Sequence, residues 1–463
     1  DCRDACSSGV NWEETELTAR RLALLISELF YASHVESTCG GASLIGQGPV
    51  SLYKSLRRQA SLRRSNFHLG DVEIIARSLR ETSLHPGRID LGRLTAEWVA
   101  LDRPANHGLF LLQTLGRRFI TRHPRKVEAL AITIDGFGRI ARALVRLLAR
   151  SGSGGEVRLV MVRSRNPEAL PRRKQLLQND TVYGGFFGDL ELIPSGMRIN
   201  GLDVAFADST AALPPGCVLL DSTSGQHAAE AADWIDRFAL RACIFSSFKA
   251  ELPLIIHGLN EYEIHDLEVP AFGAGSDAAN AVLPVLNLIH QEYRIESGHV
   301  ELIRPFTNDQ NLLDNLHQTP RLGRAATANL VLSEENIALE LERASLPAAI
   351  TSSILRVPIL NGSLAILVLQ LGSTVSREDL FRFLVDQSVN GNLRDQLDFI
   401  QAPDFVSSDA TGNQASAIID GNRIDVQGNQ IRLYLWYDNE LGYAMQLIRL
   451  LKCLASLSFI QYS

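Results

Sequence analysis

A short apolar run that ends at two glycines and leads into a helical pattern most constrains the fold of this chain. Leu130 to Ile134 is apolar, as expected for a strand buried on both faces of a parallel sheet. Gly136 and Gly138 follow this run. A helical pattern comes next, with apolar residues three or four positions apart at Ile140, Leu144, Leu147 and Leu148. A second apolar run, Val157 to Val162, completes a strand–helix–strand unit. This pattern predicts an α/β fold with a Rossmann dinucleotide-binding domain.

The glycine turn also predicts a binding site. Glycines at 136 and 138 let the backbone approach a pyrophosphate, and the start of the helix at Arg139 and Ile140 supplies N–H donors. The third position of the glycine fingerprint is Ala141. We therefore expect Gly136, Gly138, Arg139 and Ile140 to contact a dinucleotide if one binds.

The end of the second strand bears on which dinucleotide binds. An acidic residue there would bond the ribose 2′-hydroxyl of NAD, but this chain has Arg163-Ser164-Arg165. Arg163 can hold the 2′-phosphate of NADP, or these arginines can be solvated or bind another protein surface. We expect NADP or no cofactor, with NAD less favoured.

Composition excludes several classes of protein. The chain has 463 residues, 46% of them hydrophobic, which fits a globular protein of two or three domains. No apolar run approaches the length of a membrane span. The net charge of −7 gives no general reason to bind nucleic acid. Six scattered cysteines without histidine partners indicate a reducing, intracellular compartment and no metal site.

The N-terminal part carries no catalytic pattern. Residues 1–125 are predicted to be a helical region, with Leu22, Leu25, Ile26, Leu29 and Phe30 at helical spacing. The chain begins at Asp1 rather than Met, which is consistent with a removed leader, for example an organellar leader such as a mitochondrial one. A shortened chain would look the same. The compartment, organellar or cytoplasmic, stays open.

Four segments, taken together and in order, resemble the glyceraldehyde-3-phosphate dehydrogenase family, and its long form with an N-terminal extension most closely. They are Ile134 to Ala141, Ser276 to Asn280, Thr307 to Asn311 and Trp436 to Tyr443. The resemblance implies a Rossmann domain over 126–275 and an α+β catalytic-type domain over 276–440. It also implies a C-terminal helix, within 441–463, that returns to the Rossmann domain.

The resemblance also shows what is missing. The family loop reads Ser-Cys-Thr-Thr-Asn and its cysteine is the nucleophile, whereas this chain has Asp277 at that position and Ala278 after it. The family histidine that serves as base corresponds to Arg304. A phosphate-binding threonine corresponds to Glu335, and Ser224 stands where a glycine lies close to the cofactor.

Other family positions are kept. The resemblance implies that Thr307 and Arg356 are the remnant of a substrate-phosphate site, and that Thr223 and Asn439 face the cofactor. Because Asp277 and Arg304 would face each other as opposite charges, we predict a direct salt bridge between them. The alternative is that Arg304 turns to solvent or to a neighbouring subunit.

These substitutions favour a pseudoenzyme with a structural or scaffolding role, as a homo-oligomer or as a subunit of a larger assembly. The alternatives are an active NAD(P)-dependent aldehyde dehydrogenase with altered chemistry, and a binding module that a dinucleotide orders. The N-terminal region is expected to contact other chains or the dinucleotide domain.

Overall fold

The computed structural model describes residues 12–121, 124, 128–151, 155–223, 227–333, 337–344, 346, 349–455 and 460–462. The chain divides into two compact units. Unit 1 comprises residues 1–128, 153–156 and 455–463, and unit 2 comprises residues 129–152 and 157–454.

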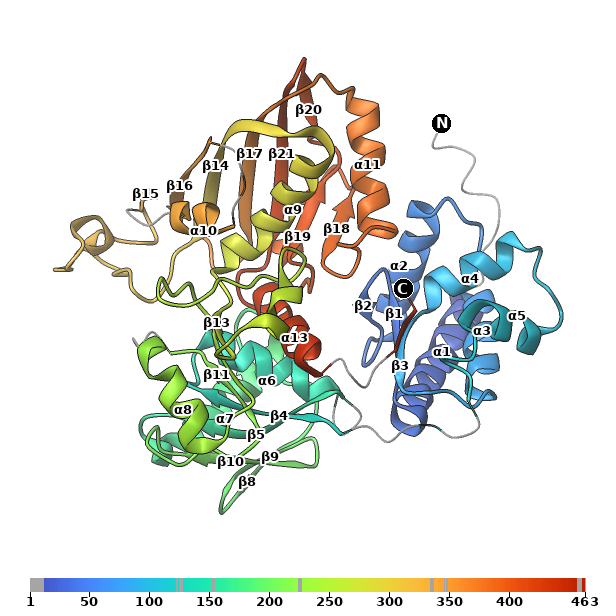
Figure 1. Ribbon diagram of the computed structural model, residues 1–463, viewed down its shortest axis with the longest axis horizontal. Helices are drawn as coiled ribbons and strands as arrows, with labels where there is room; N and C mark the ends of the chain where they lie inside the picture. The colour runs from blue at the N-terminus through green and yellow to red at the C-terminus, as the bar shows by residue number, and fades with distance from the viewer. Residues whose placement is uncertain are drawn as a thin grey trace. The chain divides into compact units, whose positions relative to one another are not determined.

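Unit 1 consists of helices around a small sheet (Figure 1). Its elements are α1 (Trp12–Ser33), β1 (Val35–Cys39), β2 (Ala42–Ser43), α2 (Pro49–Leu62), α3 (Leu69–Arg80), β3 (Gly87–Asp90), α4 (Leu91–Ala100), α5 (His107–Leu115) and β22 (Ile460–Tyr462). The predicted helical face of α1 is confirmed, because Leu22, Leu25, Ile26, Leu29 and Phe30 are all buried.

The sheet of unit 1 was not anticipated from the sequence. Its strand order is β2-β1-β3-β22, and β3 pairs in parallel with both β1 and β22. The last strand, β22, therefore joins the N-terminal unit although it comes from the other end of the chain. The predicted C-terminal helix is α13 (Leu441–Ala455), and it ends before this strand.

The first half of unit 2 is a Rossmann-like domain, which confirms the predicted α/β class. Its sheet has the order β13-β12-β11-β4-β5-β10-β9-β8, parallel from β13 to β10. The strands are β4 (Leu130–Asp135), β5 (Val157–Arg163), β8 (Leu190–Ile193), β9 (Gly196–Ile199), β10 (Leu202–Ala207), β11 (Val218–Asp221), β12 (Ala242–Phe245) and β13 (Ala271–Gly273). The helices are α6 (Arg139–Ser151), α7 (Leu170–Gln178) and α8 (Ala231–Phe238), and β6 (Asn179–Asp180) pairs with β7 (Gly184–Gly185).

The strand register places three charged residues in a row at the carboxyl ends of this sheet. Asp221 on β11 lies opposite Asp135 on β4, and Asp135 lies opposite Arg163 on β5. The carboxyl ends of parallel strands form the ligand-binding edge of such sheets. The row therefore lies where a dinucleotide would be bound.

The second half of unit 2 is an α+β domain. Its sheet has the order β15-β16-β14-β17-β21-β19-β18, with β20 paired to β21. The strands are β14 (Ile295–Pro305), β15 (Val331–Leu332), β16 (Ala349–Val357), β17 (Ser363–Leu371), β18 (Leu397–Ile400), β19 (Ala417–Asp420), β20 (Asp425–Gln427) and β21 (Gln430–Tyr437). The helices are α9 (Asp277–Tyr293), α10 (Ala338–Arg343), α11 (Arg377–Val389) and α12 (Ser407–Ala410), besides α13.

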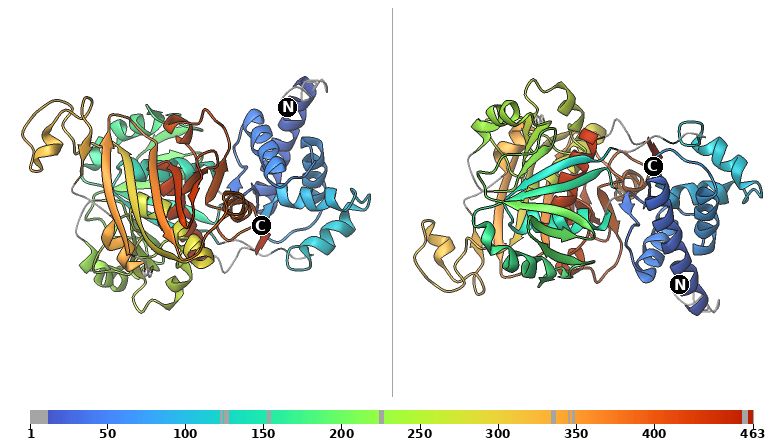
Figure 2. Two further views of the ribbon diagram at one scale, coloured as in Figure 1. Left: turned by 90° about the horizontal axis from the view of Figure 1, so that it is seen from above. Right: turned by 90° about the horizontal axis from the view of Figure 1, so that it is seen from below.

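Packing in this half follows the sequence pattern. Along β17 buried residues alternate with half-buried ones, as expected for a strand with one face in the core. Helix α9 contacts β14, β17 and β21, so it covers one face of the sheet (Figure 1). The chain between β14 and β15 projects from the rest of unit 2 (Figure 2).

None of the described helices combines the length and the apolar character needed to span a membrane.

Three cysteines are buried free thiols, which is usual for small core residues: Cys39, Cys217 and Cys243. Cys453 is half-buried. Burial raises the pKa of the Cys243 thiol to about 12, so this thiol stays protonated.

Candidate functional site

Asp277 is the first residue of α9. The helix starts there because the Ser276 side chain caps it: Ser276 Oγ accepts a hydrogen bond from Ala279 N at 3.1 Å. The residues from Ala278 to Leu286 are all buried, which fixes the helix against the sheet. A carboxylate at this end is favoured by the helix dipole.

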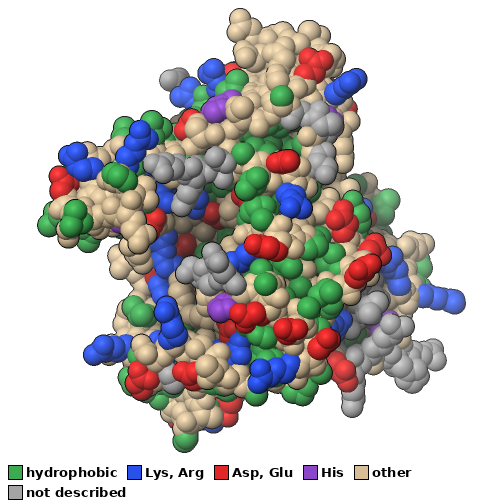
Figure 3. Space-filling model, turned by 60° about the vertical axis from the view of Figure 1, so that its left-hand side comes forward, with side chains coloured by type: hydrophobic (Ala, Val, Ile, Leu, Met, Phe, Trp, Pro, Cys, Tyr) green, Lys and Arg blue, Asp and Glu red, His purple; other side chains and the backbone are tan. Residues whose placement is uncertain are grey.

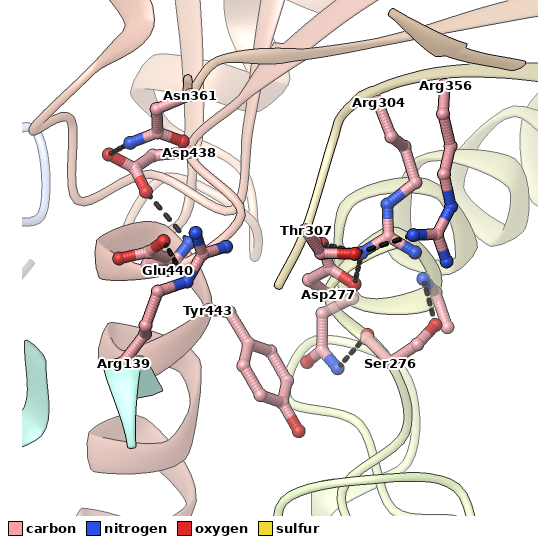
Figure 4. A network of polar contacts seen from close by, with 12 residues as sticks. Arg139, Ser276, Asp277, Arg304, Thr307, Arg356, Asn361, Asp438, Glu440 and Tyr443 are labelled. Atoms are coloured by element: carbon pink, nitrogen blue, oxygen red, sulfur yellow. Dashed lines mark hydrogen bonds and ion pairs between the residues drawn. The ribbon is translucent and has the colours of Figure 1, made fainter. Parts of the chain in front are cut away.

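Arg304 reaches Asp277 from β14. Its Nη2 donates to both carboxylate oxygens, at 2.8 Å and 2.7 Å, as Figure 4 shows. The Arg304 side chain is 22% exposed and that of Asp277 is 10% exposed. The predicted salt bridge is therefore confirmed, and the alternative of an Arg304 turned to solvent is wrong. One guanidinium nitrogen bridges the two oxygens, so the pair is not a parallel fork.

A second carboxylate at this helix end was missed by sequence reasoning. Glu340 on α10 is only 4% exposed and accepts hydrogen bonds from Ser276 N at 2.6 Å and Ser276 Oγ at 2.9 Å. These donors are the kind that bind anions at a helix N-terminus. A side chain of the protein itself thus takes a position that suits an external anion.

A sequence signal for Glu340 was present. Ile337 and Leu341 are buried, and Glu340 lies between them on the same face of α10. A glutamate on the apolar face of a short amphipathic helix indicates a buried carboxylate with a specific partner.

Glu340 makes the stability of the fold sensitive to pH. Burial raises its pKa to about 7, although the hydrogen bonds from Ser276 oppose this shift. Because the folded state holds the proton more tightly than the unfolded chain does, the stabilisation is full at acidic pH and is lost as the pH rises through about 7.

Comparison with Glu340→Gln, which does not titrate there, tests this effect. Between about pH 5 and about pH 8 the native protein should lose about 2 kcal/mol of unfolding free energy relative to the variant. Urea denaturation at a series of pH values measures this difference. Parallel pH profiles for the two proteins would show that Glu340 does not titrate in this range.

The expected substrate-phosphate remnant is also occupied from within. Arg356 Nη1 donates to Thr307 Oγ1 at 2.5 Å and to the two carboxylate oxygens of Asp309 at 3.0 Å and 3.1 Å. Burial opposes ionisation of Asp309, but hydrogen bonds from Thr307 and Arg356 lower its pKa. The structure therefore brings Thr307 and Arg356 together, as expected, with a carboxylate that sequence reasoning did not anticipate.

The glycine turn keeps the features of a dinucleotide site. Gly136 has a φ of 92°, and a Cβ there would lie 3.1 Å from Ser222 Oγ, so glycine is required. Above Gly138 the space is open, with nothing within 4 Å of an added Cβ. Arg139 Nε lies 2.7 Å from a carboxylate oxygen of Glu440, and Ile140 is half-buried beside it.

Asn439 lies between Asp438 and Glu440, and the Glu440 carboxylate contacts Arg139 at the glycine turn. Asp438 accepts hydrogen bonds from Tyr183 Oη, Glu440 N and Leu441 N, each at 2.8 Å, which anchors the start of α13. In Figure 4 the group of Arg139, Asp438 and Glu440 lies on one side, and Tyr443 points toward the Asp277 side. The Asn439 amide oxygen is buried without a hydrogen-bond partner in the described chain. These residues fit a dinucleotide, and Asn439 would hold an amide of it.

The prediction for Arg163 needs correction. Its Nε and Nη2 donate to the two carboxylate oxygens of Asp135, at 2.6 Å and 2.5 Å, and its side chain is 5% exposed. It also bonds Ala211 O at 2.9 Å and lies 5.9 Å from the Trp234 ring centroid. The arginine is therefore not solvated, and its guanidinium is already neutralised rather than turned to a 2′-phosphate.

Thr223 is likewise engaged within the fold. Its hydroxyl donates to Asp221 at 2.6 Å, and its backbone N–H donates to the same oxygen at 2.7 Å. Arg165, by contrast, is exposed. The substitutions Ser224 and Glu335 lie outside the described residues, and Ala278 is buried in α9.

Comparison with known proteins agrees with this architecture. The family model described as glyceraldehyde 3-phosphate dehydrogenase, C-terminal domain, matches residues 276–439. A glyceraldehyde-3-phosphate dehydrogenase-like protein of Pseudomonas aeruginosa is 29% identical over 94% of this chain and 98% of its own length. Residues 276–439 therefore match the C-terminal domain of the glyceraldehyde-3-phosphate dehydrogenase family, and the chain as a whole is similar to members of that family. This confirms the resemblance found in the four sequence segments.

Two further relatives delimit the shared part. Glyceraldehyde-3-phosphate dehydrogenase 2 of Streptomyces arenae is 28% identical over 70% of this chain and 98% of its own length. Glyceraldehyde-3-phosphate dehydrogenase 1 of Bacillus subtilis is 27% identical over 70% of this chain and 97% of its own length. The family is one of NAD(P)-dependent oxidoreductases, and within it this chain carries Asp277 and Arg304 as an ion pair.

Proposed function

We propose that this chain is a pseudoenzyme of the glyceraldehyde-3-phosphate dehydrogenase family with a structural or scaffolding role inside the cell, in an organelle or in the cytoplasm. The Asp277–Arg304 ion pair carries the proposal. A carboxylate is a poor nucleophile toward an aldehyde and forms no thioester. An arginine stays protonated in proteins and cannot act as a general base.

The anion positions around the pair support the same conclusion. Glu340 holds the N–H and hydroxyl of Ser276, and Asp309 holds Arg356. A phosphate brought to Arg356 would meet the Asp309 carboxylate at close range, and like charges in a partly buried site repel. At Ser276 the donors that a phosphate would need are already bonded to Glu340. Nucleophile, base and anion sites are thus altered together.

For the cofactor we propose NADP or none, with NAD less favoured. The open glycine turn and the unpaired Asn439 oxygen leave room for a dinucleotide. Since Arg163 is paired with Asp135, the support for a 2′-phosphate contact now comes from the exposed Arg165. Thermal unfolding with and without each dinucleotide tests this order, because a ligand that binds the folded state raises its stability. A large rise would also favour the binding-module alternative.

The alternative function is an active NAD(P)-dependent aldehyde dehydrogenase with altered chemistry. The kept glycine turn and Asn439 favour it, because they are the parts that would receive a hydride-accepting cofactor. An absorbance assay of NAD(P) reduction with aldehyde substrates separates the two functions. The pseudoenzyme proposal expects no reduction.

A scaffolding role needs surfaces that contact other chains. The segment between β14 and β15 projects from unit 2 and exposes several leucines, Leu316 at 96% and also Leu312, Leu313 and Leu330. Figure 3 brings this side forward and shows hydrophobic side chains on a projecting part beside a hollow. Exposed apolar residues gathered in this way mark a contact surface. We propose that this segment, together with unit 1, joins the chain to a homo-oligomer or a larger assembly.

The mass of the native particle, isolated from its source, tests the assembly proposal. A particle of at least two chains, or one that contains other proteins, is the expected result. A monomer at physiological concentration would contradict it.

A further inference from the structure

Helix α6 carries four arginines on one face. Arg139, Arg142, Arg146 and Arg150 follow one another at spacings of three, four and four residues, which aligns them along the helix. The first two lie at the glycine turn. Arg146 and Arg150 instead line a cavity of about 210 Å³, together with Tyr183, Phe187 and Thr411. At about 1.5 Å per residue, Arg150 lies roughly 16 Å along the helix from Arg139.

Arg146 is a buried cation with neutral partners. It is 9% exposed, and its Nη2 donates to the carbonyl oxygens of Leu177 and Gly184, at 2.7 Å and 3.0 Å. Its Nε has no hydrogen-bond partner in the described chain. Burial lowers the pKa of Arg146, while the nearby Asp180 carboxylate opposes this shift. A buried charge that lacks a bonded counter-ion is costly and favours an anion nearby.

The nearest acid does not fill that role. Asp180 Oδ1 accepts hydrogen bonds from Val182 N at 2.9 Å and Tyr183 N at 3.0 Å, which fixes the turn beside the cavity. No hydrogen bond or ion pair joins Asp180 to Arg146 among the described residues. The cavity therefore retains positive charge.

The remaining lining offers a second cation, a hydroxyl and an apolar wall. Arg150 is exposed, and neither it nor the Thr411 hydroxyl has a hydrogen bond or ion pair within the described chain. Phe187 is largely exposed, and Leu147 and Leu441 also line the cavity. Guanidinium groups recognise carboxylate and phosphate oxygens, and an aromatic side chain takes an apolar or aromatic body.

We propose that this cavity binds a small organic anion, with its phosphate or carboxylate head at Arg150, Arg146 and Thr411 and its apolar body against Phe187. The proposal does not depend on the pseudoenzyme assignment, because neither Asp277 nor Arg304 nor a glycine of the turn lines the cavity. It gives the chain a ligand site separate from the one its family uses.

Isothermal titration of the full chain with phenyl phosphate tests the proposal. Saturable binding is expected, and Arg150→Ala should weaken it at least about tenfold, because a charge-assisted hydrogen bond is lost. Thr411→Val should weaken it less. Arg382→Ala is the matched control, since Arg382 is an exposed arginine of α11 outside the cavity, and it should bind as the native chain does.

Three results would overturn the proposal. The native chain could fail to bind phenyl phosphate, Arg150→Ala could bind it as tightly as the native chain, or the uncharged benzyl alcohol could bind as well as phenyl phosphate. Binding that survives Arg150→Ala would place the anion elsewhere, including at the glycine turn.

Discussion

The purified protein is expected to reduce neither NAD nor NADP when it is given glyceraldehyde 3-phosphate with phosphate or arsenate. The thiol that would attack the aldehyde is absent, and Asp277 in its place is neutralised by Arg304. Covalent and acid–base catalysis contribute rate factors of many orders of magnitude, so losing both leaves no turnover that this assay detects. Absorbance of the reduced nicotinamide measures the rate.

Two samples control this assay. Glyceraldehyde-3-phosphate dehydrogenase 1 of Bacillus subtilis, a relative of this chain, shows that the substrates are competent. An Asp277→Ala variant identifies the origin of any signal, because contaminating activity would persist in it. Turnover by the native chain that disappears in Asp277→Ala would establish new chemistry at this carboxylate.

Replacing Arg163 with methionine is expected to destabilise the fold by about 3–5 kcal/mol, because it leaves a buried carboxylate unpaired. Asp135 is almost as buried as Arg163, and Asp221 lies opposite it on the neighbouring strand. Burial raises the pKa of Asp221, and the nearby Asp135 carboxylate raises it further. Without the guanidinium, two acidic groups would share a site with little water. Urea denaturation measures the loss.

The next arginine along the chain supplies a matched control. Arg165 is exposed, so Arg165→Met should change the unfolding free energy by less than about 0.5 kcal/mol. Arg163→Met combined with Asp135→Asn should recover part of the loss, because the unpaired charge is then removed. Equal, small effects for Arg163→Met and Arg165→Met would mean that the buried pair does not stabilise the fold.

Local patterns in the sequence were sufficient for the main elements of unit 2. The apolar run to Ile134, the glycines and the helical spacing through Leu148 specified β4 and α6, because each signal lies within a few residues. The serine at 276 and the helical run after it specified α9 in the same way. These predictions needed no information on distant contacts.

The partners of the charged site residues could not be found in this way. Glu340 is 64 residues from Ser276, and Asp309 is 47 residues from Arg356. Such pairs form only when the sheet brings the strands and helices together. Arg163 illustrates the error that follows: its place at a strand end suggested a ligand, whereas the strand register supplied Asp135.

The sheet of unit 1 was hidden for a related reason. Strand β3 is short, and it pairs with β22 from the end of the chain. A strand of four residues has too little alternation to stand out from the helices around it. The Asp277–Arg304 pair, in contrast, could be predicted because the family resemblance placed both positions in one cleft.

A double-mutant cycle at positions 277 and 304 tests most directly whether an ion pair holds the place of nucleophile and base. Asp277→Asn, Arg304→Met and the double variant are compared with the native chain by urea denaturation, so that the helix-dipole effect on Asp277 cancels. The pair is largely but not fully buried, and a coupling free energy of about 2 kcal/mol is expected. If the two single effects add within about 0.5 kcal/mol, the residues do not interact, and the paired replacement of thiol and base is contradicted.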